Sequence, residues 1–95
     1  MSGRFHFTMN EEWFISFREK LDQHHQWPSL YVFKFIVPTG KEEDVKKILA
    51  PATTTERLSK QGNYTSITAQ LIMPSSDSVI AIYQKASLIE GLIAL

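Results

Sequence analysis

The sequence contains no cysteine, and that absence excludes several kinds of chemistry at once. Disulfides, thiolate zinc sites, iron–sulfur clusters and thiol nucleophiles all need cysteine side chains. A chain without cysteine also suits a reducing compartment, where disulfide bonds rarely persist. Residues 1–9 are polar and aromatic and lack the basic and apolar regions of a secretory signal. We therefore expect a cytoplasmic protein.

The chain also lacks a net charge and a long apolar run. Lys and Arg total 10 and Asp and Glu total 10, so the formal net charge is zero, whereas nucleic-acid-binding domains usually carry a basic excess on one face. The longest basic cluster, Lys46-Lys47, follows an acidic run over 42–44, an order that suits a helix dipole. No apolar run approaches the ~18–20 residues needed to span a bilayer. We therefore expect neither nucleic acid nor a membrane as a partner.

Sequence motifs for phosphate binding and for covalent catalysis are missing. Gly62 stands alone in a predicted turn, without the spacing that lets several backbone amides hold a phosphate. No serine lies in a Gly-x-Ser-x-Gly motif, and the Ser-Ser-Asp segment at 75–77 is typical of a helix cap. We therefore predict that the protein has no catalytic residues and is not an enzyme.

The three histidines do not form a recognisable metal site. His24 and His25 are neighbours at the end of a predicted helix, where adjacent residues point in different directions, and His6 precedes that helix. A metal ion needs ligands that converge from fixed elements. We expect these histidines to be solvated, and we predict neither a metal nor another cofactor.

The chain does have the composition of one small globular domain. It has 95 residues, of which 43% are hydrophobic and 21% are charged, and these values argue against disorder. Asn10 is a good N-cap residue, and Trp13, Phe17 and Leu21 follow it at four-residue spacing. This pattern predicts an amphipathic helix that ends near His24. We divide the chain into a leader with this helix, 1–26, and a domain, 27–95.

Four predicted strands and two predicted helices then follow in the order β-α-β-β-α-β. The strands cover 29–37, 53–60, 64–73 and 88–95, and the helices cover about 42–49 and the segment after Pro74. Strand 29–37 is apolar on both faces except at Lys34, which is typical of a central strand. Right-handed crossovers favour an α+β, ferredoxin-like fold: a four-stranded antiparallel sheet in the order 4-1-3-2, with both helices on one face.

Segments of this predicted domain resemble a known family. The segment 27–36, Trp-Pro-Ser-Leu-Tyr-Val-Phe-Lys-Phe-Ile, resembles the opening strand of the YbeD-like family of small bacterial proteins of unknown function. The segment 59–67, Ser-Lys-Gln-Gly-Asn-Tyr-Thr-Ser-Ile, resembles that family's hairpin, and the segment 89–93 also fits. The resemblance implies a ferredoxin-like fold similar in shape to amino-acid-sensing regulatory domains of the ACT type. It implies no established reaction.

One face of the predicted sheet, which we call the open face, has no helices over it and carries the candidate binding residues. Alternation places on it Leu30, Val32, Lys34 and Ile36 from the first strand and Tyr64, Ser66, Thr68 and Gln70 from the third. The candidate surface for a small anion, a carboxylate ligand or another chain comprises Lys34, Tyr64, Ser66 and Thr68, with Asn63 in the adjacent turn. Alternatively, Lys34 forms a cross-strand pair with Glu90 or Glu56.

The aliphatic side chains on the open face need a cover, because contiguous exposed apolar surface normally marks an interface. Two covers are available: the N-terminal helix with Trp13 and Phe17, or a second copy of the sheet in a two-fold homodimer. The candidate interface residues are therefore Trp13, Phe17, Leu30, Val32 and Ile36.

The absence of catalytic groups and the ACT-like resemblance favour a non-enzymatic regulatory or interaction module that binds a small ligand or a protein partner. One alternative is a nucleic-acid-binding module, since ferredoxin-like sheets can stack bases on exposed aromatic side chains. Tyr64 is the aromatic residue that the third strand would offer for such stacking. The other alternative is a subunit that contributes residues to a partner enzyme.

Overall fold

The computed structural model describes residues 11–95, which form seven elements of secondary structure. They are α1 (Glu11–His24), β1 (Ser29–Pro38), α2 (Glu42–Leu49), β2 (Thr54–Leu58), β3 (Tyr64–Met73), α3 (Ser76–Ala86) and β4 (Ile93–Ala94). Asn10, the predicted N-cap, and His6 lie outside the described residues. The predicted bounds of α1, α2 and β3 are confirmed, and β2 is shorter than predicted.

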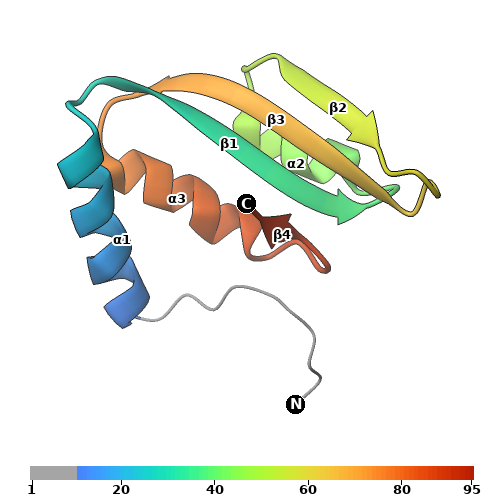
Figure 1. Ribbon diagram of the computed structural model, residues 1–95, viewed down its shortest axis with the longest axis horizontal. Coiled ribbons are helices and arrows are strands. Elements are labelled where there is room, and N and C mark those ends of the chain that lie inside the picture. The colour runs from blue at the N-terminus through green and yellow to red at the C-terminus, as the bar shows by residue number, and fades with distance from the viewer. Residues whose placement is uncertain (1–10) are drawn as a thin grey trace.

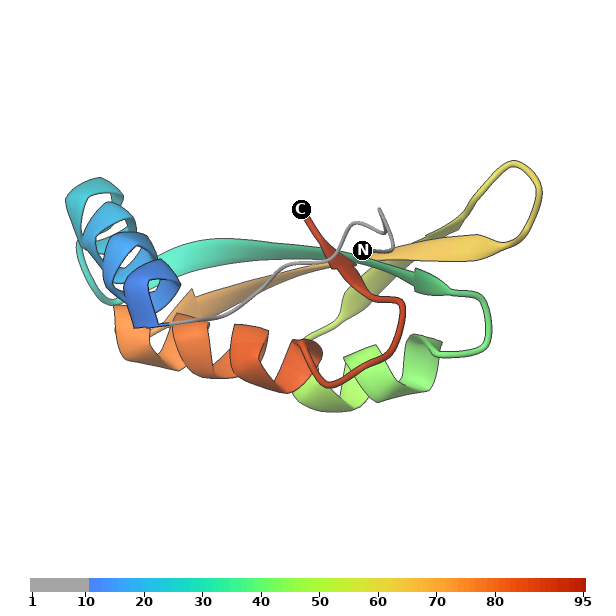
Figure 2. The ribbon, with the colours of Figure 1, turned by 90° about the horizontal axis from the view of Figure 1, so that it is seen from below.

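The four strands form one antiparallel sheet in the order β2-β3-β1-β4. This is the predicted order read from the other edge, so the predicted ferredoxin-like α+β fold is confirmed. The two central strands pair along their whole length, from Ser29 opposite Met73 to Pro38 opposite Tyr64. Figures 1 and 2 show α2 and α3 together on one side of the sheet, which leaves the other side as the open face.

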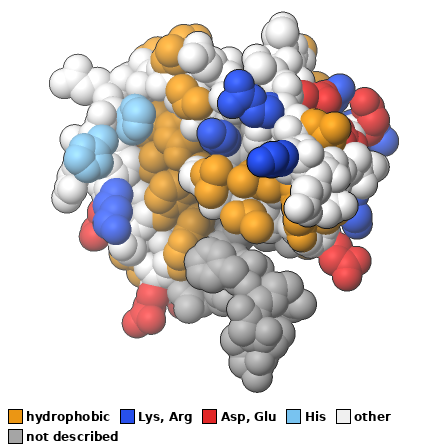
Figure 3. Space-filling view, turned by 45° about the vertical axis from the view of Figure 1, so that its right-hand side comes forward, with side chains coloured by type: hydrophobic (Ala, Val, Ile, Leu, Met, Phe, Trp, Pro, Cys, Tyr) orange, Lys and Arg blue, Asp and Glu red, His pale blue; other side chains and the backbone are white. Residues whose placement is uncertain are grey.

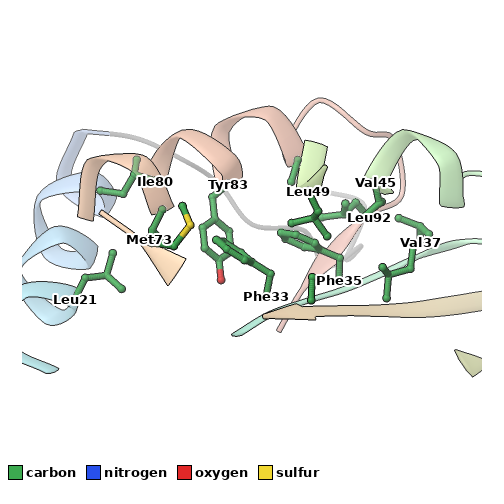
Figure 4. Close-up of a cluster of buried hydrophobic side chains, with 14 residues drawn as sticks. Leu21, Phe33, Phe35, Val37, Val45, Leu49, Met73, Ile80, Tyr83 and Leu92 are labelled. Carbon is green, nitrogen blue, oxygen red and sulfur yellow. The ribbon is translucent and has the colours of Figure 1, made fainter. Parts of the chain in front are cut away.

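The core lies between the sheet and the two helices, and strand alternation decides which residues enter it. Phe33, Phe35 and Val37 point from β1 toward the helices and are fully buried, as the period of two along a strand requires. They meet apolar side chains from α2, from α3 and from the segment after α3 (Figure 4). Ser75 caps α3, accepting a hydrogen bond from the Ser78 backbone N–H at 3.2 Å, as the sequence predicts.

Helix α1 packs against α3 and does not lie across the open face. The Trp13 and Phe17 rings lie 6.4 and 5.2 Å from the ring of Tyr83 on α3. Arg18 also forms an ion pair of 2.6 Å with Asp77 at the start of α3. The alternative in which Trp13 and Phe17 cover the aliphatic side chains of the open face is therefore wrong.

The prediction of a strand over 88–95 is wrong for most of that segment. Leu88 is exposed, and the chain turns twice, with Ile89 N–H donating to Ala86 and Leu92 N–H donating to Ile89. Gly91 has a φ of +82°, a left-handed conformation open to glycine and foreign to a strand. The turns carry Leu92 into the core, so only Ile93 and Ala94 remain to pair with β1.

The prediction of a solvated histidine is wrong for His25. Its ring stacks on Trp27 with centroids 5.1 Å apart, and its Nδ1 atom lies 2.9 Å from the Ser29 hydroxyl. Trp27 in turn donates a hydrogen bond to Asp22 at 2.9 Å. His25 therefore helps to connect α1 to β1, whereas His24 is exposed as predicted.

Candidate functional site

The register of three strands brings a polar group of side chains together on the open face. Lys34 of β1 lies opposite Thr68 of β3, and Ile36 lies opposite Ser66. On the other side of β3, β2 places Thr55 opposite Thr68 and Arg57 opposite Ser66. Ser66 and Thr68 of β3 thus lie between β1, which carries Lys34, and β2, which carries Arg57.

Neither of these two cations is neutralised by a neighbouring carboxylate. Lys34 and Arg57 are both exposed, and neither side chain forms an ion pair or hydrogen bond within residues 11–95. The expected pair between Lys34 and Glu56 or Glu90 is wrong. Glu56 lies opposite Ile67, on the helix-covered face, and binds Lys46 of α2, which raises the pKa of Lys46.

The cations border an open hollow of about 270 Å³ whose wall is mostly apolar. Its lining consists of Lys34, Ile36, Arg57, Leu58, Ser59, Tyr64, Ser66 and Leu95. A second hollow adjoins it and shares Lys34, Arg57 and Ser66 with it. Figure 3 shows Lys and Arg side chains grouped beside hydrophobic ones on the surface. A ligand that fits this surface combines an anionic group with an apolar part.

Two of the predicted site residues lie at the hairpin that joins β2 to β3. Tyr64 borders the hollow, and 46% of it is exposed. Asn63 lies away from Lys34, in a separate depression at the turn, and its carbonyl accepts a hydrogen bond from Thr39 N–H at 3.0 Å. Gly62 has a φ of +79°, which confirms its predicted role in the turn. The structure therefore groups Lys34, Tyr64, Ser66 and Thr68 and leaves Asn63 apart.

The strands that carry the site are held to α2 by hydrogen bonds to Glu42, a partly exposed residue on the opposite face. Glu42 accepts a hydrogen bond from the buried Thr65 hydroxyl at 2.7 Å and another from Gly40 N–H at 2.8 Å. The Thr65 bond and the neighbouring backbone bonds lower the pKa of the Glu42 carboxyl. Because Thr65 immediately precedes Ser66, this network also positions the β3 backbone beneath the site.

The aliphatic part of the open face remains exposed at the other end of the sheet. Leu30 and Val32 are 50% and 49% exposed, and Ile72, opposite Leu30, is 66% exposed. Trp13 and Phe17, predicted to share an interface with them, lie in the helical layer. The five predicted interface residues therefore do not form one continuous surface.

Arg57, Thr55 and Leu58 are site residues that the sequence reasoning missed. They lie in β2, whose sequence predicts a polar edge strand but has no apolar alternation to show which face is buried. The hairpin carries the missing information: pairing Leu58 with Thr65 across the turn places Arg57 opposite Ser66. Alternation from that pair puts Thr55 and Arg57 on the open face and Glu56 on the other. Alternation would also assign Leu58 to the covered face, yet Leu58, the last residue of β2, lines the hollow.

Residues 11–95 contain no group of three or more His, Asp or Glu side chains able to hold a metal ion. Within the same part of the chain, no helix combines the length and the apolar character that crossing a membrane requires.

Comparison with protein families gives one match, to the family described as "Protein of unknown function (DUF493)", over residues 22–94. This is the YbeD-like family, and the segments 27–36 and 59–67 that resemble it both lie within the match. No curated protein and no solved structure matches the chain.

Proposed function

We propose that this chain, which belongs to the YbeD-like family of proteins of unknown function (DUF493), is a non-enzymatic module that binds an anionic ligand on its open face. The observation that carries the proposal is the pair Lys34 and Arg57, exposed on either side of Ser66 without a carboxylate partner within residues 11–95. Two like charges on one face create a local positive potential that attracts an anion.

The groups around the two cations suit a carboxylate. Arginine binds a carboxylate through two parallel hydrogen bonds, lysine adds three donors, and the Thr68 hydroxyl offers a further donor. The Ser66 hydroxyl donates at 3.4 Å to the Arg57 backbone carbonyl. Ile36 and Leu58 provide apolar surface beside them. A small molecule or a peptide end with a carboxylate and an adjoining aliphatic part satisfies both features.

The arrangement favours binding over catalysis. Acid–base catalysis needs a titratable side chain within hydrogen-bond reach of the reacting atom. Among the residues that line the two hollows, Glu56 is the carboxylate, and it is already engaged by Lys46. A ligand-sensing role would agree with the ACT-like resemblance, which concerns the fold and is an analogy for function.

The test is a titration of isotope-labelled protein, in which the chemical shifts of the backbone amides report binding. The probes are hexanoate, inorganic phosphate and a short single-stranded RNA. We expect hexanoate to shift the amides of Lys34, Arg57 and Ser66, and to do so less at high salt, because salt screens exposed charges. Lys34→Gln and Arg57→Gln should each weaken the response.

The matched control is Lys47→Gln, which removes an exposed cation from α2, on the helical side of the sheet. It should leave the response unchanged. Equal losses in all three variants would show unspecific attraction of anions and would contradict the proposal. Tighter binding of RNA, with shifts centred on Tyr64, would favour the nucleic-acid-binding alternative.

A further inference from the structure

Half of strand β1 has a neighbour on only one side. It pairs with β3 over ten residues, but with β4 only at Phe35 and Ile36. One more bond, from Leu95 N–H to the Lys34 carbonyl at 2.9 Å, ends this second contact. Within the described part of the chain, the outer edge of β1 therefore has no pairing strand over residues 30–33.

Antiparallel geometry identifies the backbone groups on this edge. In such a sheet the N–H and C=O of one residue point to the same side, and successive residues alternate. Because the Lys34 carbonyl points toward β4, the groups of Val32 and Leu30 point to the free edge. No hydrogen bond within residues 11–95 uses the Val32 N–H, the Val32 carbonyl or the Leu30 N–H. The Leu30 carbonyl has one long contact, 3.4 Å from the Ser29 hydroxyl.

The same two residues expose their side chains on the open face. Leu30 and Val32 are each about half exposed, and Ile72 lies beside Leu30 with 66% of its surface exposed. Unpaired strand edges are sites where another chain can add as a further strand. Backbone hydrogen bonds then give affinity, and alternate side chains give specificity. Here the edge and an apolar patch coincide.

We propose that residues 30–33 of β1 bind an extended peptide segment of a partner protein, which adds to the sheet as a short strand. Its alternate side chains facing the open face are aliphatic and contact Leu30 and Val32. An acidic residue at the end nearest Lys34 meets that unpaired cation. The two proposed sites share Lys34, but strand addition depends on backbone groups that the anion site does not use.

The surroundings of the edge favour a short strand over a second copy of this chain. Figures 1 and 2 show α1 beside the sheet where β1 begins, on the same side of β1 as β4. The free stretch is therefore bounded by α1 at one end and by Leu95 at the other. A single peptide strand fits into this gap, whereas α1 obstructs the approach of the wider sheet of a second copy.

The first measurement is amide hydrogen exchange in the free protein. The amides of Leu30 and Val32 should exchange much faster than those of Tyr31 and Phe33, which point toward β3. A display library of random linear peptides is then selected against the full chain. Enriched sequences should alternate aliphatic residues and carry an acidic residue at one end. A synthetic peptide of the enriched sequence should slow exchange at Leu30 and Val32.

The decisive variant is Val32→Pro, which removes the outward N–H donor and leaves the Tyr31 and Phe33 bonds to β3 in place. Proline is tolerated on the unpaired side of an edge strand. Val32→Thr, the matched control, keeps the N–H and the β-branched shape. We expect Val32→Pro to weaken peptide binding by at least about tenfold and Val32→Thr to retain it.

Three outcomes would overturn the proposal. One is equal binding of the selected peptide by both variants, and another is slow exchange of the Val32 amide in the free monomer. The third is a dimer, seen by light scattering, that Val32→Pro dissociates, because the occupant would then be a second copy. If circular dichroism shows that Val32→Pro does not fold, the test uses the wild-type protein. The proposal then requires that the peptide slow hydrogen exchange at the Leu30 and Val32 amides, and unchanged exchange would overturn it.

Discussion

Tyr31 and Tyr83 connect the sheet to helix α3 through their hydroxyl groups, whose oxygen atoms lie 3.1 Å apart. The Tyr83 ring also lies 5.2 Å from Phe17 and 5.7 Å from Phe33, so it contacts α1 and β1 as well as its own helix. Tyr83 is therefore a residue at which side chains of α1, α3 and β1 meet. Burial raises the pKa of the Tyr83 hydroxyl above the ordinary value, and the hydrogen bond to Tyr31 raises it further.

The raised pKa of Tyr83 predicts a loss of stability in alkali. A group with a raised pKa in the folded state contributes stability that is present below its unfolded pKa and is lost above it. Stability should therefore fall once the pH rises through about 10, the ordinary pKa of tyrosine. Urea unfolding at several pH values checks this. Tyr83→Phe should cost about 1 kcal/mol at neutral pH but should flatten the alkaline decrease, and an unchanged slope would contradict the assignment.

The lowered pKa of Glu42 predicts the opposite dependence in acid. Its bond from Thr65 favours the ionised carboxylate, so its contribution is present above the unfolded pKa and is lost as pH falls through the folded value. Glu42→Gln should reduce the difference in unfolding free energy between neutral and acidic pH. Glu90→Gln, at an exposed residue in the turn before β4, is the control and should leave that difference unchanged.

Much of the fold could be predicted from local pattern, because β3 alternates apolar and polar residues and β1 is apolar on both faces except at Lys34. The segment 75–77 likewise predicts the start of α3, where Ser75 is the N-cap. The terminal segment failed because its apolar residues satisfy two patterns: Leu92 fills the core from a turn as well as it would from a strand. The left-handed conformation of Gly91 distinguishes the turn from a strand. The presence of a glycine in the sequence does not show which conformation that glycine adopts.

The candidate site could be predicted on β1 and β3, where Lys34, Ser66 and Thr68 follow from alternation alone. Arg57 could not be assigned, since its face depends on how β2 pairs across the hairpin. The position of α1 also escaped prediction. An amphipathic stripe shows that a helix buries one side, but not which partner it meets, and here the partner is Tyr83.

Gly91 should be intolerant of substitution. A Cβ atom there would lie 2.7 Å from Pro38 Cγ, and the φ of +82° disfavours any L side chain. Gly91→Ala should cost about 1–3 kcal/mol in unfolding free energy. Gly40 is the control: its φ is also positive, at +110°, but no atom lies within 4 Å of an added Cβ. A substitution there introduces backbone strain without a steric contact. Gly40→Ala should therefore cost less in the same urea experiment, and equal losses would show that the contact with Pro38 is unimportant.

Helix α1 should contribute to the stability of the domain, although the proposed boundary places it outside residues 27–95. It contributes Leu21, which is 4% exposed, and it covers Tyr83 with Phe17. Replacing a buried leucine by alanine costs about 2–5 kcal/mol. We therefore expect Leu21→Ala to destabilise the full chain by an amount in that range, whereas Ile15→Ala, on the exposed side of α1, should have little effect.

A chain that begins at Trp27 tests the same contact by removal. It should keep the circular dichroism of the sheet, unfold at a lower urea concentration and bind a hydrophobic dye, because the Tyr83 side of α3 becomes exposed. Light scattering on a sizing column shows whether this surface then drives self-association. Unchanged stability in the shortened chain would mean that α1 is an appendage, and the domain boundary at 27 would then also be the boundary of the folding unit.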